Sequence, residues 1–263
     1  TGNYNVAIGA SALGVNTTAA SNTAVGYGSL TANTTGTTNV AVGSTAMAAN
    51  TTADNNTGIG AASMNGNTTG TRNTAVGSDS LKVNTTGNDN TAVGKGALTA
   101  NTTASNNTAV GKNALAANTT GANNTAVGKS ALDANTTGAS NTVLGADALS
   151  ADTQGSRSVA IGTSALEVQN FTTATNTYNV AVGFNAGAAI STGTLNTAVG
   201  GLSLDATTTG SYNTAVGYSA GGAITTGESN VCIGYNAGDA ITTGGANTGL
   251  GAGALGATTT AGN

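Results

Sequence analysis

The chain has 263 residues, including 41 glycines and a single cysteine, and it lacks proline, tryptophan and histidine. Only 6% of the residues are charged, and the formal net charge is −4 with six basic residues. These counts exclude imidazole bases, histidine metal ligands, a thiolate zinc cage and an extended basic surface for nucleic acid. No run of 18 apolar residues is present, so no membrane insertion is expected. We therefore expect no enzyme activity, no cofactor and no metal site.

A 17-residue repeat runs through the chain in fifteen copies, most regular in the motif Asn-Thr-Ala-Val-Gly. The last glycine of this motif recurs every 17 residues from Gly9 to Gly251, except for one interval of 21 between Gly162 and Gly183. A unit this short is too small for a helix pair or a propeller blade but suits one coil of a β-solenoid. The sequence therefore predicts an all-β fold, a parallel β-solenoid (β-roll) of fifteen coils, with 1–263 as a single repeat domain.

The motif itself predicts a three-residue strand in each coil, with side chains that alternate between two faces. The first position is Thr in ten copies and Val in five, the middle is Ala in eleven, and the last is Val, Ile or Leu. Since neither face is polar, we expect both to be buried. One face would pack on its own coil and the alanine face on identical neighbouring chains, which predicts an oligomer joined along its length.

Other columns of the repeat also predict stacking. Asn precedes the strand in fourteen copies, with Ser158 as the exception, and stacked amides form hydrogen-bonded ladders. The recurring glycine marks a sharp turn or a close approach of two backbones. Leu or Met stands four residues after that glycine in twelve copies, whereas the other three copies combine a glycine there with an isoleucine three residues later: Gly187 with Ile190, Gly221 with Ile224, and Gly238 with Ile241. Because loss and gain coincide, we expect the isoleucine to refill the core.

The position after the turn glycine varies most and predicts an exposed ridge. Lysines in successive coils are tolerated only in water, and ammonium groups beside aromatic rings could hold an acidic glycan. A solvated edge without a ligand is the alternative. The candidate ligand contacts are Tyr27, Lys95, Lys112, Lys129, Phe184, Tyr218 and Tyr235.

The single 21-residue interval carries four extra residues, and its candidate recognition loop includes Glu167 and Phe171. A tolerated insertion is the alternative, because surface loops cost little. A GxGxxG string at Gly251–Gly256 belongs to the repeat and lacks the following helix and acidic residue, so it predicts no nucleotide site. Cys232 occupies the alanine column, where we expect a buried small side chain.

The strings NTAVGKNAL, SVAIGTSAL and NVAVGFNAG resemble the head repeats of YadA-like trimeric autotransporter adhesins. The longer unit NTAVGKNALAANTTGAN resembles repeats of phage tail fibres and related bacterial surface fibres, although YadA-like head repeats are typically shorter than 17 residues. The resemblance implies a left-handed β-roll, a homotrimer and an extracellular location on a bacterial cell surface or a virion fibre. It also implies a host-surface glycan or protein receptor as partner.

Three functions remain open from the sequence. The first is a trimeric extracellular fibre segment that attaches to a surface by multivalent contact. The second is ice or surface binding by a rank of threonines, which the five valines in that column oppose by suggesting burial. The third is a self-assembling extracellular filament, favoured because the ends of the repeat show no polar caps. The repeat is also cut in mid-pattern, which predicts that the chain is a segment of a longer fibre.

Overall fold

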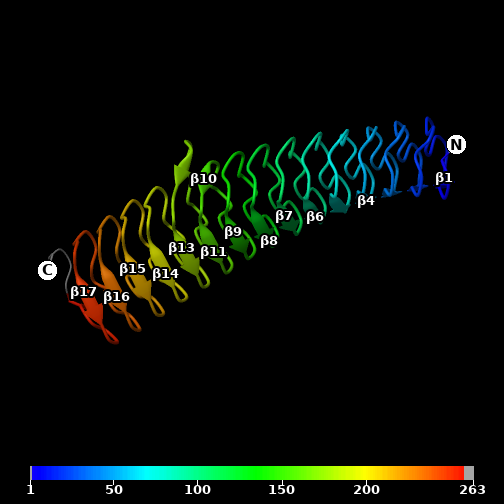
Figure 1. The fold of residues 1–263 in the computed structure, drawn as a ribbon. Helices are drawn as coiled ribbons and strands as arrows, with labels where there is room; N and C mark the ends of the chain where they lie inside the picture. Colours follow the sequence, from blue (N-terminus) through cyan, green and yellow to red (C-terminus); the bar gives the residue numbers. More distant parts are fainter. Residues whose placement is uncertain (1, 258–263) are drawn as a thin grey trace. The chain divides into compact units, whose positions relative to one another are not determined.

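The computed structural model describes residues 2–257, which belong to two compact units, Thr1–Thr125 and Ala126–Asn263. Each unit is a stack of parallel β-solenoid coils, and the described residues contain no helix (Figure 1). The predicted all-β parallel solenoid with about 17 residues per coil is therefore confirmed. The boundary between the units falls inside β8 (Thr125–Val127) rather than in a linker, and the single-domain organisation stays a prediction.

In the first unit, seven strands pair in chain order with the repeat in register, so that Thr57 lies beside Thr74 and Ile59 beside Val76. The strands are β1 (Val6–Ile8), β2 (Thr23–Val25), β3 (Val40–Val42), β4 (Thr57–Ile59), β5 (Thr74–Val76), β6 (Thr91–Val93) and β7 (Thr108–Val110).

In the second unit, the main sheet has the same parallel register, and two further strands pair in a small sheet on the side of the coil away from β9 and β11 (Figure 1). The main strands are β9 (Thr142–Leu144), β11 (Val159–Ile161), β13 (Val180–Val182), β14 (Thr197–Val199), β15 (Thr214–Val216), β16 (Val231–Ile233) and β17 (Thr248–Leu250). The small sheet consists of β10 (Gly155–Ser156) and β12 (Thr175–Asn176).

The recurring glycine ends each main strand for both of the reasons that the sequence suggested. Gly77 has a φ of 134°, and a Cβ atom there would lie 2.7 Å from the carbonyl carbon of Gly94 in the next coil. Side chains are therefore excluded by conformation and by space. Further left-handed residues, such as Asp79 and Leu81, turn the chain back toward the next strand.

The middle residue of each strand points into the solenoid. Ala24, Ala41 and Ala75 are fully buried, and a Cβ atom on Gly58 in this column would lie 2.9 Å from Cγ of Met47. The prediction that the alanine face needs a neighbouring chain to cover it is wrong. The interior of a 17-residue coil already holds a leucine or methionine and buried asparagines, so only a small side chain fits beside them. The Thr/Val and Val/Ile/Leu positions face outward instead.

The exchange of leucine for isoleucine is confirmed. Ile190, Ile224 and Ile241 are fully buried. A Cβ atom on Gly187 would lie 2.9 Å from Cδ1 of Ile190, so the isoleucine occupies the space that leucine fills in other coils.

The predicted asparagine ladder is also confirmed, and a second ladder accompanies it. In the first ladder, the asparagine before the strand accepts the backbone N–H of its counterpart in the next coil, as from Asn39 to Asn22 at 2.9 Å. The second ladder runs through the Asn-Thr-Thr segments from Asn16 to Asn118, with Nδ2–Oδ1 distances of 2.8 to 3.3 Å. In both ladders, buried asparagines occupy part of the interior of the coil and form hydrogen bonds between coils, where a larger protein core would have hydrophobic contacts.

Candidate binding surfaces

The outer face of the main sheet is the first candidate surface. Its Thr or Val and Val, Ile or Leu side chains form two columns, and neither column contains a charged residue in any of the fifteen copies. Ile59, Val216 and Ile233 are 37 to 39% exposed. The column of Val, Ile and Leu side chains is apolar and continues from coil to coil, which is typical of an interaction surface.

The ridge after the turn glycine is exposed at every lysine that the sequence singled out, namely Lys95 and Lys112 in the first unit and Lys129 in the second. Lys129 Nζ lies 3.5 Å from Oδ2 of Asp147 in the following coil. Lys82, outside the ridge, lies 2.8 Å from Asp79, and this hydrogen bond is the main reason why the pKa of the Asp79 carboxyl is lowered, with a smaller contribution from the Lys95 charge. Carboxylates therefore lie near the ridge lysines Lys95 and Lys129.

The aromatic residues of the ridge are exposed as well. Tyr27 stands in the first unit, whereas Phe184, Tyr218 and Tyr235 stand in the second. The rings of Tyr218 and Tyr235 stack in successive coils with centroids 5.9 Å apart and an angle of 13° between their planes. These two rings thus stack along the direction in which successive coils follow one another.

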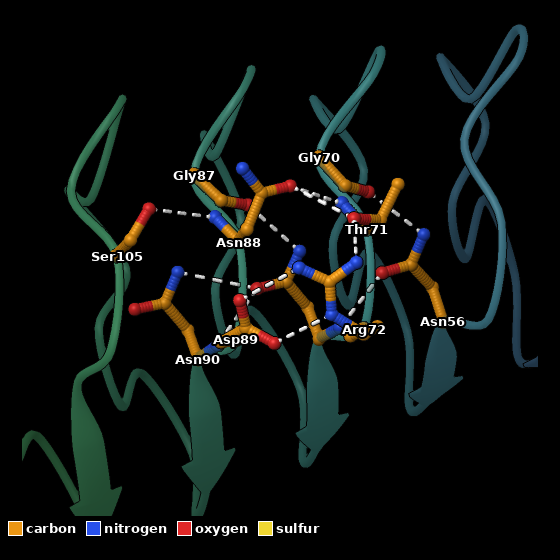
Figure 2. Close-up of polar contacts among 10 residues, drawn as sticks. Asn56, Gly70, Thr71, Arg72, Gly87, Asn88, Asp89, Asn90 and Ser105 are labelled. Carbon is orange, nitrogen blue, oxygen red and sulfur yellow. Dashed lines mark hydrogen bonds and ion pairs between the residues drawn. The ribbon is translucent and has the colours of Figure 1, made fainter.

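A second ridge, which the sequence did not suggest, consists of the left-handed residue before each strand asparagine. In the first unit, Arg72 Nε and Nη2 donate to the two carboxylate oxygens of Asp89 at 2.7 and 2.9 Å (Figure 2). This pairing holds the pKa of the Asp89 carboxyl below its usual range. In the second unit, Arg157 lies over the ring of Tyr178, 5.6 Å from its centroid. A signal was present in the sequence, because this column contains both arginines and three of the six tyrosines.

A polar column beside this ridge ties neighbouring coils together. The Thr71 N–H and Oγ1 both donate to Oδ1 of Asn88, at 2.7 and 3.0 Å, and the Asn88 N–H donates to Oγ of Ser105 at 3.0 Å (Figure 2). These contacts satisfy the backbone where no strand pairing exists. Their role is structural.

The 21-residue interval does not expose the ring of Phe171, which is only 8% accessible. Asp152 is fully buried and accepts the Phe171 N–H at 3.1 Å and Nε2 of Gln169 at 2.6 Å. Gln169 Oε1 accepts Nδ2 of Asn179 at 2.8 Å. Glu167 is half-buried. The extra residues are therefore built into the coil by a buried polar network, and a ligand at this loop would meet its exposed threonines rather than Phe171.

Other chemistry is scarce in the part of the chain that the structure describes. Cys232 is buried as expected, and burial raises the pKa of its thiol. Between residues 2 and 257, no cluster of three potential metal ligands, no enclosed pocket and no helix able to cross a membrane is found.

No protein-family model matches the chain, and no curated protein matches it.

Proposed function

We propose that this chain is a segment of an extracellular fibre in which three copies associate along their outer sheet faces, and that the fibre serves attachment rather than catalysis. The observation that carries the proposal is the uncharged outer face, with Val, Ile or Leu at one of its two positions in every strand of the main sheet. The number three and the extracellular location rest on the resemblance of the repeats to those of YadA-like adhesins and phage tail fibres.

Exposure of this face to water is unfavourable, and burial against another copy removes that cost. Each apolar side chain contributes about 25 cal/mol per Å² of area removed from water. Because Val76, Val93 and Val110 recur in register on adjacent strands, any contact that suits one coil is repeated by the next. Weak contacts per coil therefore add up to a stable lengthwise assembly.

The mass of the purified chain in solution, measured by light scattering, tests this proposal. We expect a value near three chains. A charge on the outer face, as in the double variant Val76→Lys with Ile161→Lys, should lower that mass. The matched control Ser78→Lys with Thr163→Lys places the same charges two residues later on the same coils, in a column that already holds lysines, and should leave the mass unchanged.

Two results would overturn the assembly. If the parent chain is a monomer, the copies do not associate through the outer face. If the mass increases with concentration well beyond three chains, the assembly is an open filament and not a trimer. Circular dichroism of each variant distinguishes dissociation from unfolding.

Ice or surface binding by the threonine column is the second candidate. The five valines in this column suggested that it is buried, but these positions lie on the outer face. Thr57, Thr74 and Thr91 lie in register on β4, β5 and β6, and the valines that replace threonine in this column also face outward. The column is therefore a surface rather than a core. Because a trimer would cover this face, a monomer that shows thermal hysteresis in a freezing assay, with the effect lost in Thr74→Lys, would favour ice binding over the fibre.

A further inference from the structure

Four successive coils of the second unit carry Phe184, Gly201, Tyr218 and Tyr235 at the same ridge position. Backbone hydrogen bonds of 2.9 to 3.0 Å connect this position from coil to coil. The three aromatic side chains are 53 to 60% exposed, and the Tyr218 and Tyr235 rings already stack face to face. Gly201 interrupts what would otherwise be a continuous column of four rings.

The backbone does not require a glycine at this place. Gly201 is absent from the residues with positive φ, and a Cβ atom there would meet Cδ2 of Tyr218 at 3.6 Å and the Phe184 carbonyl oxygen at 3.8 Å, both ordinary contact distances. Every other ridge position carries a side chain. The effect of the glycine is therefore that no side chain stands at this ridge position between Phe184 and Tyr218.

The width of the gap indicates what it could hold. Two coil spacings separate the backbone of Phe184 from that of Tyr218, about 10 Å. A flat aromatic guest needs about 7 Å between two flanking rings, because carbon–carbon contacts form at roughly 3.5 Å on each side. A chair-shaped pyranose is thicker, and its axial C–H groups can contact a ring on both faces. The gap suits the sugar better than the flat ring.

The surrounding charge favours a neutral sugar. Residues 158–263 contain no Lys or Arg, and their charged side chains are Glu167, Asp205, Glu228 and Asp239. Lys129, the nearest ridge lysine in this unit, stands five coils from Tyr218, about 24 Å away, and lies beside Asp147. An acidic glycan held jointly by ammonium groups and these rings is therefore disfavoured.

We propose that Phe184, Gly201 and Tyr218 form a slot for one neutral pyranose ring of a surface glycan, with the Tyr235 ring stacked behind that of Tyr218. This inference rests on the attachment part of the proposed function and names its ligand class. It requires no trimer.

The test is titration of the full chain with neutral glucose, N-acetylglucosamine and galactose oligosaccharides, followed by calorimetry and by tyrosine emission, which no tryptophan obscures. We expect at least one neutral series to bind. The variant Gly201→Tyr fills the slot, and Tyr218→Ala removes one wall, so each should weaken binding by about tenfold. Gly201→Ala checks that the fold accepts a side chain there. Tyr27→Ala removes an exposed ridge tyrosine of the first unit and should leave affinity unchanged.

Three results would overturn the slot: no neutral sugar bound by the parent chain, equal affinity in Gly201→Tyr, or tighter binding of sialylated or sulfated sugars than of neutral ones. Light scattering on the same samples separates the two proposals. A mass near three chains without sugar binding removes the slot and keeps the fibre, whereas sugar binding by a monomer keeps the slot and removes the trimer.

Discussion

The side-chain oxygen of Asn56 accepts the backbone N–H of Asn73 in the next coil at 2.9 Å, while Asn56 Nδ2 donates to the Gly70 carbonyl at 2.8 Å (Figure 2). One buried amide thus bonds to the backbone at two places, 14 and 17 residues further along the chain. Both contacts lie outside the strands of the main sheet. The unit depends on this arrangement in place of a large hydrophobic core.

Removal of one such amide should be costly. Asn73→Ala removes the acceptor of the Asn90 N–H, which lies 2.9 Å away, and one of the two donors to the Gly87 carbonyl, which keeps Asn84 Nδ2. An unsatisfied buried group costs about 1–3 kcal/mol, so we expect a loss of roughly 2–5 kcal/mol in the free energy of unfolding, measured by urea denaturation.

The control for this loss is Asn106→Gly. Asn106 is exposed, and its φ of 62° suits glycine, so the change should stay within about 0.5 kcal/mol. Equal losses in both variants would contradict a special role for the ladder.

The period and the ladder were predictable because the same residue type recurs at the same spacing. The orientation of the strands was not, because alternation between Thr or Val and Ala offers no polar contrast to mark the outside. One signal was available in the pair Met47 and Gly58: a larger residue in the turn stands beside a smaller one in the alanine column, which indicates a shared interior.

The sequence predicted the exposed ridge correctly, but it did not predict that Phe171 is buried. Lys95, Lys112 and Tyr218 are exposed as the ridge required, since a hypervariable column with like charges can only face water. Phe171 is buried because the four extra residues bring Gln169 and Asp152 into the interior, a pairing across coils that lies 17 residues apart in sequence. The spacing of residues in a loop does not predict such a network.

Adjacent glycines provide a sharp test of the turn. Gly200 has a φ of 131°, and a Cβ atom on it would overlap the Gly217 carbonyl of the next coil, whereas neither constraint applies to Gly201. We expect Gly200→Ala to lower the free energy of unfolding by at least about 2 kcal/mol. Gly201→Ala should be neutral or stabilising by up to about 1 kcal/mol. Thermal melts of the two variants decide, and the reverse order would contradict the stacking geometry.

A double-mutant cycle tests the exchange of core volume between Gly187 and Ile190. Ile190→Asn alone leaves a cavity and should cost about 2–5 kcal/mol, and Gly187→Leu alone should also destabilise because its side chain meets Cδ1 of Ile190. Together the two changes recreate the leucine and asparagine of the other coils, whose leucines adopt the same left-handed conformation. We expect a favourable coupling of about 1–3 kcal/mol in urea denaturation. Additive losses would show that the two positions do not share a space.

The half-buried carboxyl of Asp205 predicts an unusual pH dependence. Burial raises its pKa above the ordinary value, although the Asp205 and Ala206 backbone N–H groups partly oppose the shift. The folded state therefore holds this proton more tightly than the unfolded state, and the free energy of unfolding attributable to this group increases as pH falls from neutral through the folded-state pKa. Asp205→Asn keeps a hydrogen-bond acceptor and removes the charge, so it should be more stable than the parent chain at neutral pH. That advantage should shrink as pH falls toward about 4, the value for an unfolded aspartate.

Asp89 supplies the matched control, with the opposite sign. Its pairing with Arg72 lowers the pKa of the carboxyl, so its contribution to stability is present above the unfolded-state pKa and is lost as pH falls through the folded-state pKa. Asp89→Asn should therefore be less stable than the parent chain at neutral pH, by a small margin because the pair is exposed, and the difference should vanish in acid. Melting temperatures of the parent chain and both variants across this pH range give the two signs directly. If Asp205→Asn lowers the melting temperature at neutral pH, as Asp89→Asn is expected to do, burial does not govern the Asp205 carboxyl.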